Sequence, residues 1–241
     1  MRQVELFIPC FIDQLYPETG FNMVKLLKMA GCEISYNPEQ TCCGQIFFNS
    51  GHWDQAGKSA STFLSKFTEG SSIVSPGASC VGYIKNHYAS ILKDEDAKRK
   101  FNSIKDNIFE LTDFLVNVLK FTEFGSEFPY KVCYHDACSA LREYGIKSEP
   151  RKLLSKVKGL ELLEMEQNDV CCGFGGTFSI KHESISTAMS QQKIEFAMDT
   201  GAEYMVSTES SCLLNVEGYI KKHNLPLKTI HIADILASGI A

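Results

Sequence analysis

Eight of the ten cysteines fall into two series with nearly the same spacing. The series read C-x31-CC-x36-C and C-x32-CC-x39-C, and corresponding members lie 128, 129, 129 and 132 residues apart. A glycine follows each adjacent pair, in "TCCGQ" and "VCCGFGG". Four thiols form a donor set for a metal ion or cluster, and spacing this similar indicates an internal repeat. The members are Cys10, Cys42, Cys43 and Cys80 in the first series, and Cys138, Cys171, Cys172 and Cys212 in the second.

Composition favours a soluble globular protein in a reducing compartment. The chain has 241 residues, 44% of them hydrophobic and 22% charged, with a formal charge of -5, which argues against nucleic acid as a partner. The start "MRQVELFIPCFID" has no signal-peptide segment, and no apolar run approaches the ~20 residues of a transmembrane helix. We therefore expect a cytoplasmic protein, in which metal or redox chemistry is a commoner use of cysteine than disulfides.

Strand and helix patterns alternate within each half. Strands are expected at 4–8, 32–37, 71–75, 131–135, 160–165 and 203–207, and helices at 20–31, 53–67, 151–157, 184–200 and 213–224. This order predicts an α/β fold of two homologous halves, each a small, mostly parallel sheet flanked by helices. We expect domains at 1–121 and 130–241, joined around "FTEFGSEFPY".

The cysteines occupy corresponding places in both halves. In each half one cysteine follows the first strand, the adjacent pair follows the second, and the last follows the third. The carboxyl ends of parallel strands form the crevice in which α/β proteins bind ligands, so we expect each set of four thiols to converge there.

Two kinds of metal site are consistent with these thiols. Structural zinc usually takes its ligands from C-x2-C knuckles, and adjacent cysteines suit a single ion less well. An iron-sulfur cluster offers several irons, so neighbouring thiols can bind different ones. We favour the cluster, with all eight cysteines as ligands, and keep a zinc-stabilised scaffold as the alternative.

The paired motif resembles that of the cysteine-rich CCG domain family. The segments "PCFIDQLYPETG", "TCCGQ", "YHDACSALREYGI" and "CCGFGGTFS" carry the resemblance, which covers nearly the whole chain. Members include the B subunit of heterodisulfide reductase and the iron-sulfur subunit of glycolate oxidase, and the resemblance is greatest to stand-alone two-domain members of lactate utilization. In the heterodisulfide reductase type the last element is C-x2-C, whereas here Gly77 and Glu209 stand at the first of those positions. Four ligands remain for one 4Fe-4S cluster in each half, up to two in all.

The resemblance implies an iron-sulfur oxidoreductase component of the system that oxidises L-lactate, a 2-hydroxy acid, to pyruvate. Its implied partners are a ferredoxin-like iron-sulfur lactate utilization protein and a third lactate utilization protein. A heterodisulfide or thiol reductase subunit, or a glycolate oxidase subunit, is the alternative. The segment "CGFGG" matches neither G-x-G-x-x-G nor a Walker sequence, so flavin or nicotinamide binding is not indicated.

Two polar residues precede the second series. His135 and Asp136 in "YHDAC" are candidates for a hydrogen bond or proton that tunes the second cluster, and a polar turn that closes the strand is the alternative. Cys32 and Cys133 lie outside the repeated spacing, and we expect them to be small buried apolar residues.

Overall fold

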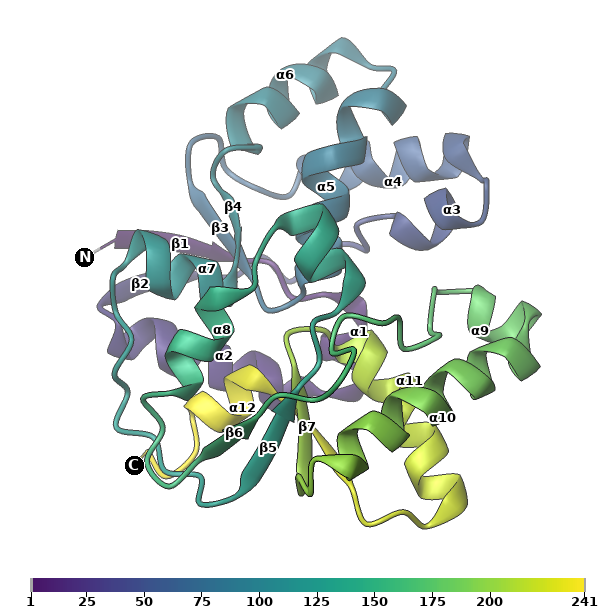
Figure 1. Ribbon diagram of the computed structural model, residues 1–241. Coiled ribbons are helices and arrows are strands. Elements are labelled where there is room, and N and C mark those ends of the chain that lie inside the picture. The colour runs from purple at the N-terminus through teal and green to yellow at the C-terminus, as the bar shows by residue number, and fades with distance from the viewer. Residues whose placement is uncertain (1, 241) are drawn as a thin grey trace.

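The computed structural model describes residues 2–240 and contains two four-stranded sheets, in both of which every paired strand is parallel (Figure 1). Their strand orders are β2-β1-β3-β4 and β6-β5-β7-β8, so the two halves have the same topology. The strands are β1 (Arg2–Leu6), β2 (Cys32–Ser35), β3 (Ser72–Ser75), β4 (Ile108–Glu110), β5 (Lys131–Tyr134), β6 (Glu161–Leu163), β7 (Tyr204–Ser207) and β8 (Lys228–His231).

Helices connect the strands and cover both faces of each sheet. In the first half they are α1 (Cys10–Leu15), α2 (Pro17–Met29), α3 (Gln45–Asn49), α4 (Trp53–Leu64), α5 (Ala78–Ile91), α6 (Glu95–Ile104) and α7 (Leu111–Asp113), followed by the π-helical turn η1 (Phe114–Val118). The second half has the π-helical turn η2 (Ser139–Tyr144) and helices α8 (Ser148–Leu154), α9 (Phe178–Lys181), α10 (Glu183–Asp199), α11 (Ser210–His223) and α12 (Ile232–Leu236).

Both faces of each sheet are buried. Successive residues of a strand point to opposite faces, so they join different cores. Val74 of β3 joins an apolar core in the middle of the molecule, whereas Ile73 joins a core on the outer side of the first sheet. Val206 and Met205 of β7 divide in the same way between the middle core and an outer core of the second half.

The middle core belongs to both halves. Figure 1 shows α2, α7, α8 and α12 gathered between the two sheets, with α2 packed on α12 and α7 on α8. Leu27 of α2, Leu153 of α8 and Ile235 of α12 are fully buried there. Two cross-half contacts lie nearer the cysteines, since η2 packs on α5 and α1 contacts α11.

The predicted fold class is confirmed, and the expected strands and helices are present with small shifts at their ends. The sequence does not predict the fourth strand of each sheet, because β4 and β8 end in the buried polar residues Glu110 and His231, which interrupt the apolar pattern. The domain limits 1–121 and 130–241 stay a prediction. Within residues 2–240, no helix combines the length and apolar character needed to span a bilayer.

Candidate metal centre

One cavity brings together the cysteines of both series. Its volume is about 170 Å³, and its walls include the segments that follow the first three strands of each sheet. A water molecule needs roughly 10–15 Å³ measured in the same way, so the cavity has room for a group much larger than a single ion. The cysteines in its wall are Cys10, Cys42, Cys43, Cys80, Cys138, Cys171, Cys172 and Cys212.

The turn after each adjacent pair has the same geometry in both halves. Gly44 and Gly173 both have φ of +89°, a left-handed conformation that favours glycine. The backbone N–H of Gly44 donates to Cys42 Sγ, and that of Gly173 donates to Cys171 Sγ, each at 3.4 Å. A Cβ atom at Gly173 would lie 2.7 Å from the Ser186 carbonyl oxygen, so a side chain there would displace α10. The tight turn thus places the two thiols and an N–H donor together.

Thiol–thiol hydrogen bonds link the members of each set. They connect Cys10, Cys42, Cys43 and Cys80 in the first half, and Cys138, Cys171, Cys172 and Cys212 in the second. Donation from Cys10 and Cys43 to Cys42 holds the Cys42 pKa at about 3, against the opposing effect of burial. The same hydrogen bonds, together with burial, raise the pKa of Cys10 and of Cys43.

This donor set fits a positively charged metal group. In the first set the Cys42 thiolate is stabilised by its neighbours, whereas hydrogen bonding and burial oppose the ionisation of Cys10 and Cys43. In the second set the pKa of every thiol is raised, and burial contributes to each of these shifts. A bound metal group reverses that balance, because its charge favours thiolates over thiols. Thiolate sulfur is a ligand for both zinc and iron-sulfur clusters, and the cavity has room for the larger group.

The two positions without a fifth cysteine also face this cavity. A Cβ at Gly77 would lie 2.7 Å from Pro9 Cγ, so no longer side chain fits there without a shift. The Glu209 carboxylate accepts hydrogen bonds from Ser79 N at 2.9 Å and Ser211 Oγ at 2.8 Å. Glu209 therefore ties the start of α5 in the first half to α11 in the second.

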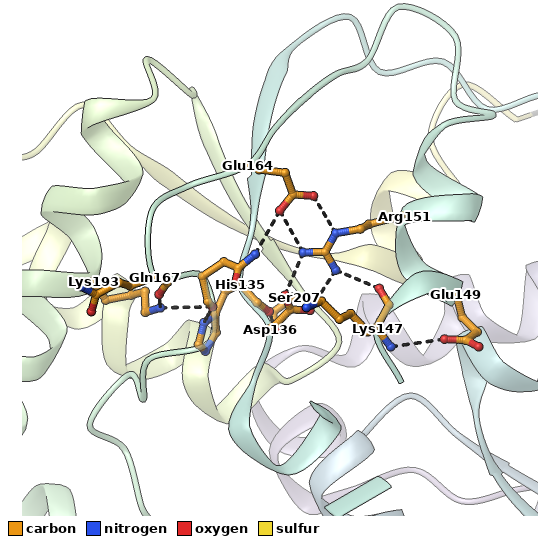
Figure 2. Close-up of polar contacts among 10 residues, drawn as sticks. His135, Asp136, Lys147, Glu149, Arg151, Glu164, Gln167, Lys193 and Ser207 are labelled. Carbon is orange, nitrogen blue, oxygen red and sulfur yellow. Dashed lines mark hydrogen bonds and ion pairs between the residues drawn. The ribbon is translucent and has the colours of Figure 1, made fainter. Parts of the chain in front are cut away.

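His135 and Asp136 are adjacent in sequence but have different surroundings (Figure 2). A ring nitrogen of His135 and the Sγ atoms of Cys172 and Cys212 all lie within 4.8 Å of one another. Its Nδ1 lies 3.3 Å from the Asn168 carbonyl oxygen, and its buried Nε2 has no hydrogen-bond partner within residues 2–240. Burial, followed by the nearby Lys193 cation, lowers the His135 pKa to about 3, so the ring is neutral at pH 7.

Asp136 binds an arginine instead of the thiols. Both of its carboxylate oxygens accept from Arg151, at 2.9 and 2.8 Å, and Arg151 also pairs with Glu164 at 2.6 Å (Figure 2). Asp136 thereby fixes α8 against the loop that leads to the second cysteine series. Its predicted tuning of a cluster stays a prediction, and this geometry favours His135 for that role.

Two residues behind the second set were not singled out from the sequence. Lys193 of α10 is completely buried, and Asn215 of α11 donates to the Cys172 carbonyl oxygen at 3.0 Å. Lys193 occupies the position in α10 that the buried Phe63 occupies in α4. Cys32 and Cys133 are buried in strands β2 and β5, as expected for apolar packing.

Comparisons with known proteins agree with the repeat. The family model described as a cysteine-rich domain, CCG, matches residues 4–85 and 132–217. "Lactate utilization protein A" of Oceanobacillus iheyensis is 38% identical over 234 residues, which cover 97% of this chain and 96% of that protein. The protein of the same name from Exiguobacterium sp. is 38% identical and covers 100% and 99%.

One solved structure shows the same fold. The crystal structure of a hypothetical protein from Helicobacter pylori matches with a TM-score of 0.68 at 15% identity. The match covers 100% of this chain and 49% of that one, so the present chain spans about half of that protein. At this identity the likeness supports the fold alone.

Proposed function

Because the chain belongs to the family of proteins built from the cysteine-rich CCG domain, we propose that it is an iron-sulfur component of L-lactate utilization. In this proposal it relays electrons in a multi-protein complex that oxidises L-lactate to pyruvate. The observation that carries the proposal is the single cavity lined by the eight cysteines of both repeats. The names of the relatives, which match over almost their full length, supply the lactate pathway.

The two thiol sets would each hold one 4Fe-4S cluster. Such a cluster, when bound, accepts and gives up one electron at a time. The chain contributes four thiolates to each, a backbone N–H on Cys42 Sγ and on Cys171 Sγ, and walls that exclude bulk water from Cys43, Cys172 and Cys212. Since both sets open into the same cavity, an electron would pass between them without crossing a sheet.

The removal of two electrons from a 2-hydroxy acid normally involves an organic cofactor, and this chain has no motif for flavin or nicotinamide. We therefore propose that the chain acts with a ferredoxin-like iron-sulfur lactate utilization partner and a third lactate utilization protein. A heterodisulfide or thiol reductase subunit, or a glycolate oxidase subunit, is the second candidate, because those members share the paired CCG motif.

Anaerobic purification followed by iron, acid-labile sulfide and zinc analysis tests the proposal. We expect brown protein that contains iron and sulfide. Colourless protein with stoichiometric zinc would instead support a zinc-stabilised scaffold. Lactate-dependent reduction of an artificial acceptor, assayed for the chain alone and with its two partners, then tests the pathway. Turnover is expected only with the partners, and none under either condition would exclude lactate as the substrate.

A further inference from the structure

The two thiol sets are backed by chemically different side chains, although the repeat places equivalent backbone positions behind them. Phe7 and His135 both lie three residues before the first cysteine of their series. Their N–H groups donate to the equivalent residues Val74 and Val206, at 2.9 and 2.8 Å. The repeat has therefore replaced a phenylalanine behind the first set with a histidine behind the second.

A second replacement lies on the helix that covers the outer face of each sheet. The buried positions of α4 are Ala56, Ala60, Phe63 and Leu64, and those of α10 include Ser186, Ser190, Lys193 and Ile194 at the same spacing. Phe63 and Lys193 thus correspond, and both are completely buried.

The two residues lie close together within each half. The Phe7 and Phe63 rings meet edge to face with centroids 4.8 Å apart. Lys193 Nζ donates to the carbonyl oxygens of Gln167 and Asn168 at 2.8 and 3.2 Å, and His135 Nδ1 lies against the same Asn168 oxygen (Figure 2). A lysine and an imidazole in the second half therefore take the place of an aromatic pair in the first.

Burial lowers the Lys193 pKa, and the group that most favours its cation is the Cys172 thiol rather than a carboxylate. The carboxylate with the largest effect on it is Asp169, which is half exposed and lies 3.9 Å from Arg142. Buried charges are screened only weakly, so the cation acts on the neighbouring Cys172 and Cys212. Solvent acts in the opposite direction, because Cys10 is exposed and Cys42 and Cys80 are half-buried, whereas Cys172 and Cys212 are buried. For the second set to accept electrons more readily, the buried charge of Lys193 must outweigh this difference in exposure.

Building on the proposed function, we propose that Lys193 and His135 make the second thiol set the electron acceptor of the two. A positive charge next to Cys172 and Cys212 stabilises added negative charge there, which raises the reduction potential. The neutral His135 ring donates Nδ1–H to the Asn168 oxygen that also accepts from Lys193, and so holds the acceptor that positions the cation.

Phe7 and Phe63 behind the first set supply no charge, and the Tyr88 hydroxyl there donates to the Cys43 carbonyl oxygen at 2.7 Å. With a cluster bound in each half, the one held by the first set would lose one electron and the one held by the second set would gain it. Lys193 and His135 act as positioning residues, through the thiolates they adjoin.

An EPR-monitored redox titration of the anaerobically purified protein tests this order. We expect two one-electron midpoints, and Cys42→Ser, which removes a first-set ligand, should eliminate the lower one. Lys193→Met should lower the higher midpoint by at least ~59 mV, which corresponds to a tenfold change in a one-electron equilibrium. Lys193→Arg keeps the charge and should restore it. Phe63→Met, the matched change in the first half, should produce no such fall.

A second variant tests the inference independently of whether Lys193→Met folds. Combining His135→Phe with Lys193→Phe copies the aromatic pair of the first half and should bring the two midpoints together. Equal midpoints in the wild type, or the same shift in Lys193→Met and Lys193→Arg, would overturn the inference while leaving the proposed function intact. Protein without iron and sulfide would overturn both, and the metal analysis identifies that outcome before any titration.

Discussion

Removing the guanidinium of Arg151 should destabilise the fold far more than removing a surface charge. Arg151 binds both carboxylate oxygens of Asp136, whose side chain is only 2% exposed, and its own side chain is 20% exposed. Arg151→Met keeps most of the apolar stem but leaves a buried carboxylate without its partner. Breaking a buried pair in this way costs about 3–5 kcal/mol.

That loss translates into a large change in thermal stability. For a chain of this size about 1 kcal/mol shifts Tm by about 2–4 °C, so Arg151→Met should lower Tm by roughly 6–20 °C. Circular dichroism of the reduced, metal-free protein measures this directly. Lys98→Met serves as a surface control, because its pair with Glu95 is 40% and 76% exposed and contributes less than ~0.5 kcal/mol.

A double-mutant cycle separates the ion pair from general damage. Adding Asp136→Asn to Arg151→Met removes the buried charge, so the double variant should be more stable than the sum of the single effects predicts, by about 0.5–3 kcal/mol. Additive losses, or a fall below ~1 kcal/mol for Arg151→Met, would refute the reasoning that this pair holds α8 against the second cysteine loop.

Three further changes probe other parts of the structure. Cys43→Ser should reduce bound iron by about half, as measured by metal analysis, whereas Cys32→Ser, in a buried strand position outside the cavity wall, should leave it unchanged. Burial raises the Glu110 pKa from 4.5 to about 8, so the folded state retains a proton there and stability should fall as pH rises between those values. Glu110→Gln should flatten that fall in thermal melts across pH. Gly173→Ala should destabilise the protein more than Gly31→Ala, which costs about 1 kcal/mol; both glycines have positive φ, but only at Gly173 does the added Cβ meet a backbone oxygen.

The sequence was informative wherever a regular pattern controls the structure. The order of strands and helices, together with the cysteine spacing, predicts that the eight cysteines follow the carboxyl ends of the strands. The structure places them there, because parallel strands joined by helices all have their carboxyl ends at one edge of the sheet. The fourth strands lacked such a pattern. β4 has three residues and ends in Glu110, a buried acid whose Oε2 accepts from Thr112 N at 2.7 Å and caps α7. Its burial depends on tertiary contacts that no local periodicity reports.

The two polar residues after β5 show that neighbours in sequence can have different surroundings. The sequence predicts His135 and Asp136 together beside the second thiol set. Successive residues in extended chain point to opposite sides, so His135 faces Cys172 and Cys212 while Asp136 faces Arg151. Lys193 was missed for a related reason. Lysines are rarely buried, and nothing in the local sequence distinguishes this one from a lysine on the solvent face of α10.

Cross-packing between the halves explains why the shared cavity keeps its shape. The segment after Cys10 reaches the second half, where Phe11 and Phe174 meet edge to face at 5.4 Å. In return, η2 after Cys138 lies on α5, where a Cβ at Gly82 would come 3.2 Å from Glu143 Cβ. Each thiol set is therefore enclosed partly by elements of the other half. Duplication has kept the cysteines and their turns at matching positions, while the side chains behind them have diverged, and that divergence can make the two sets unequal without moving a ligand.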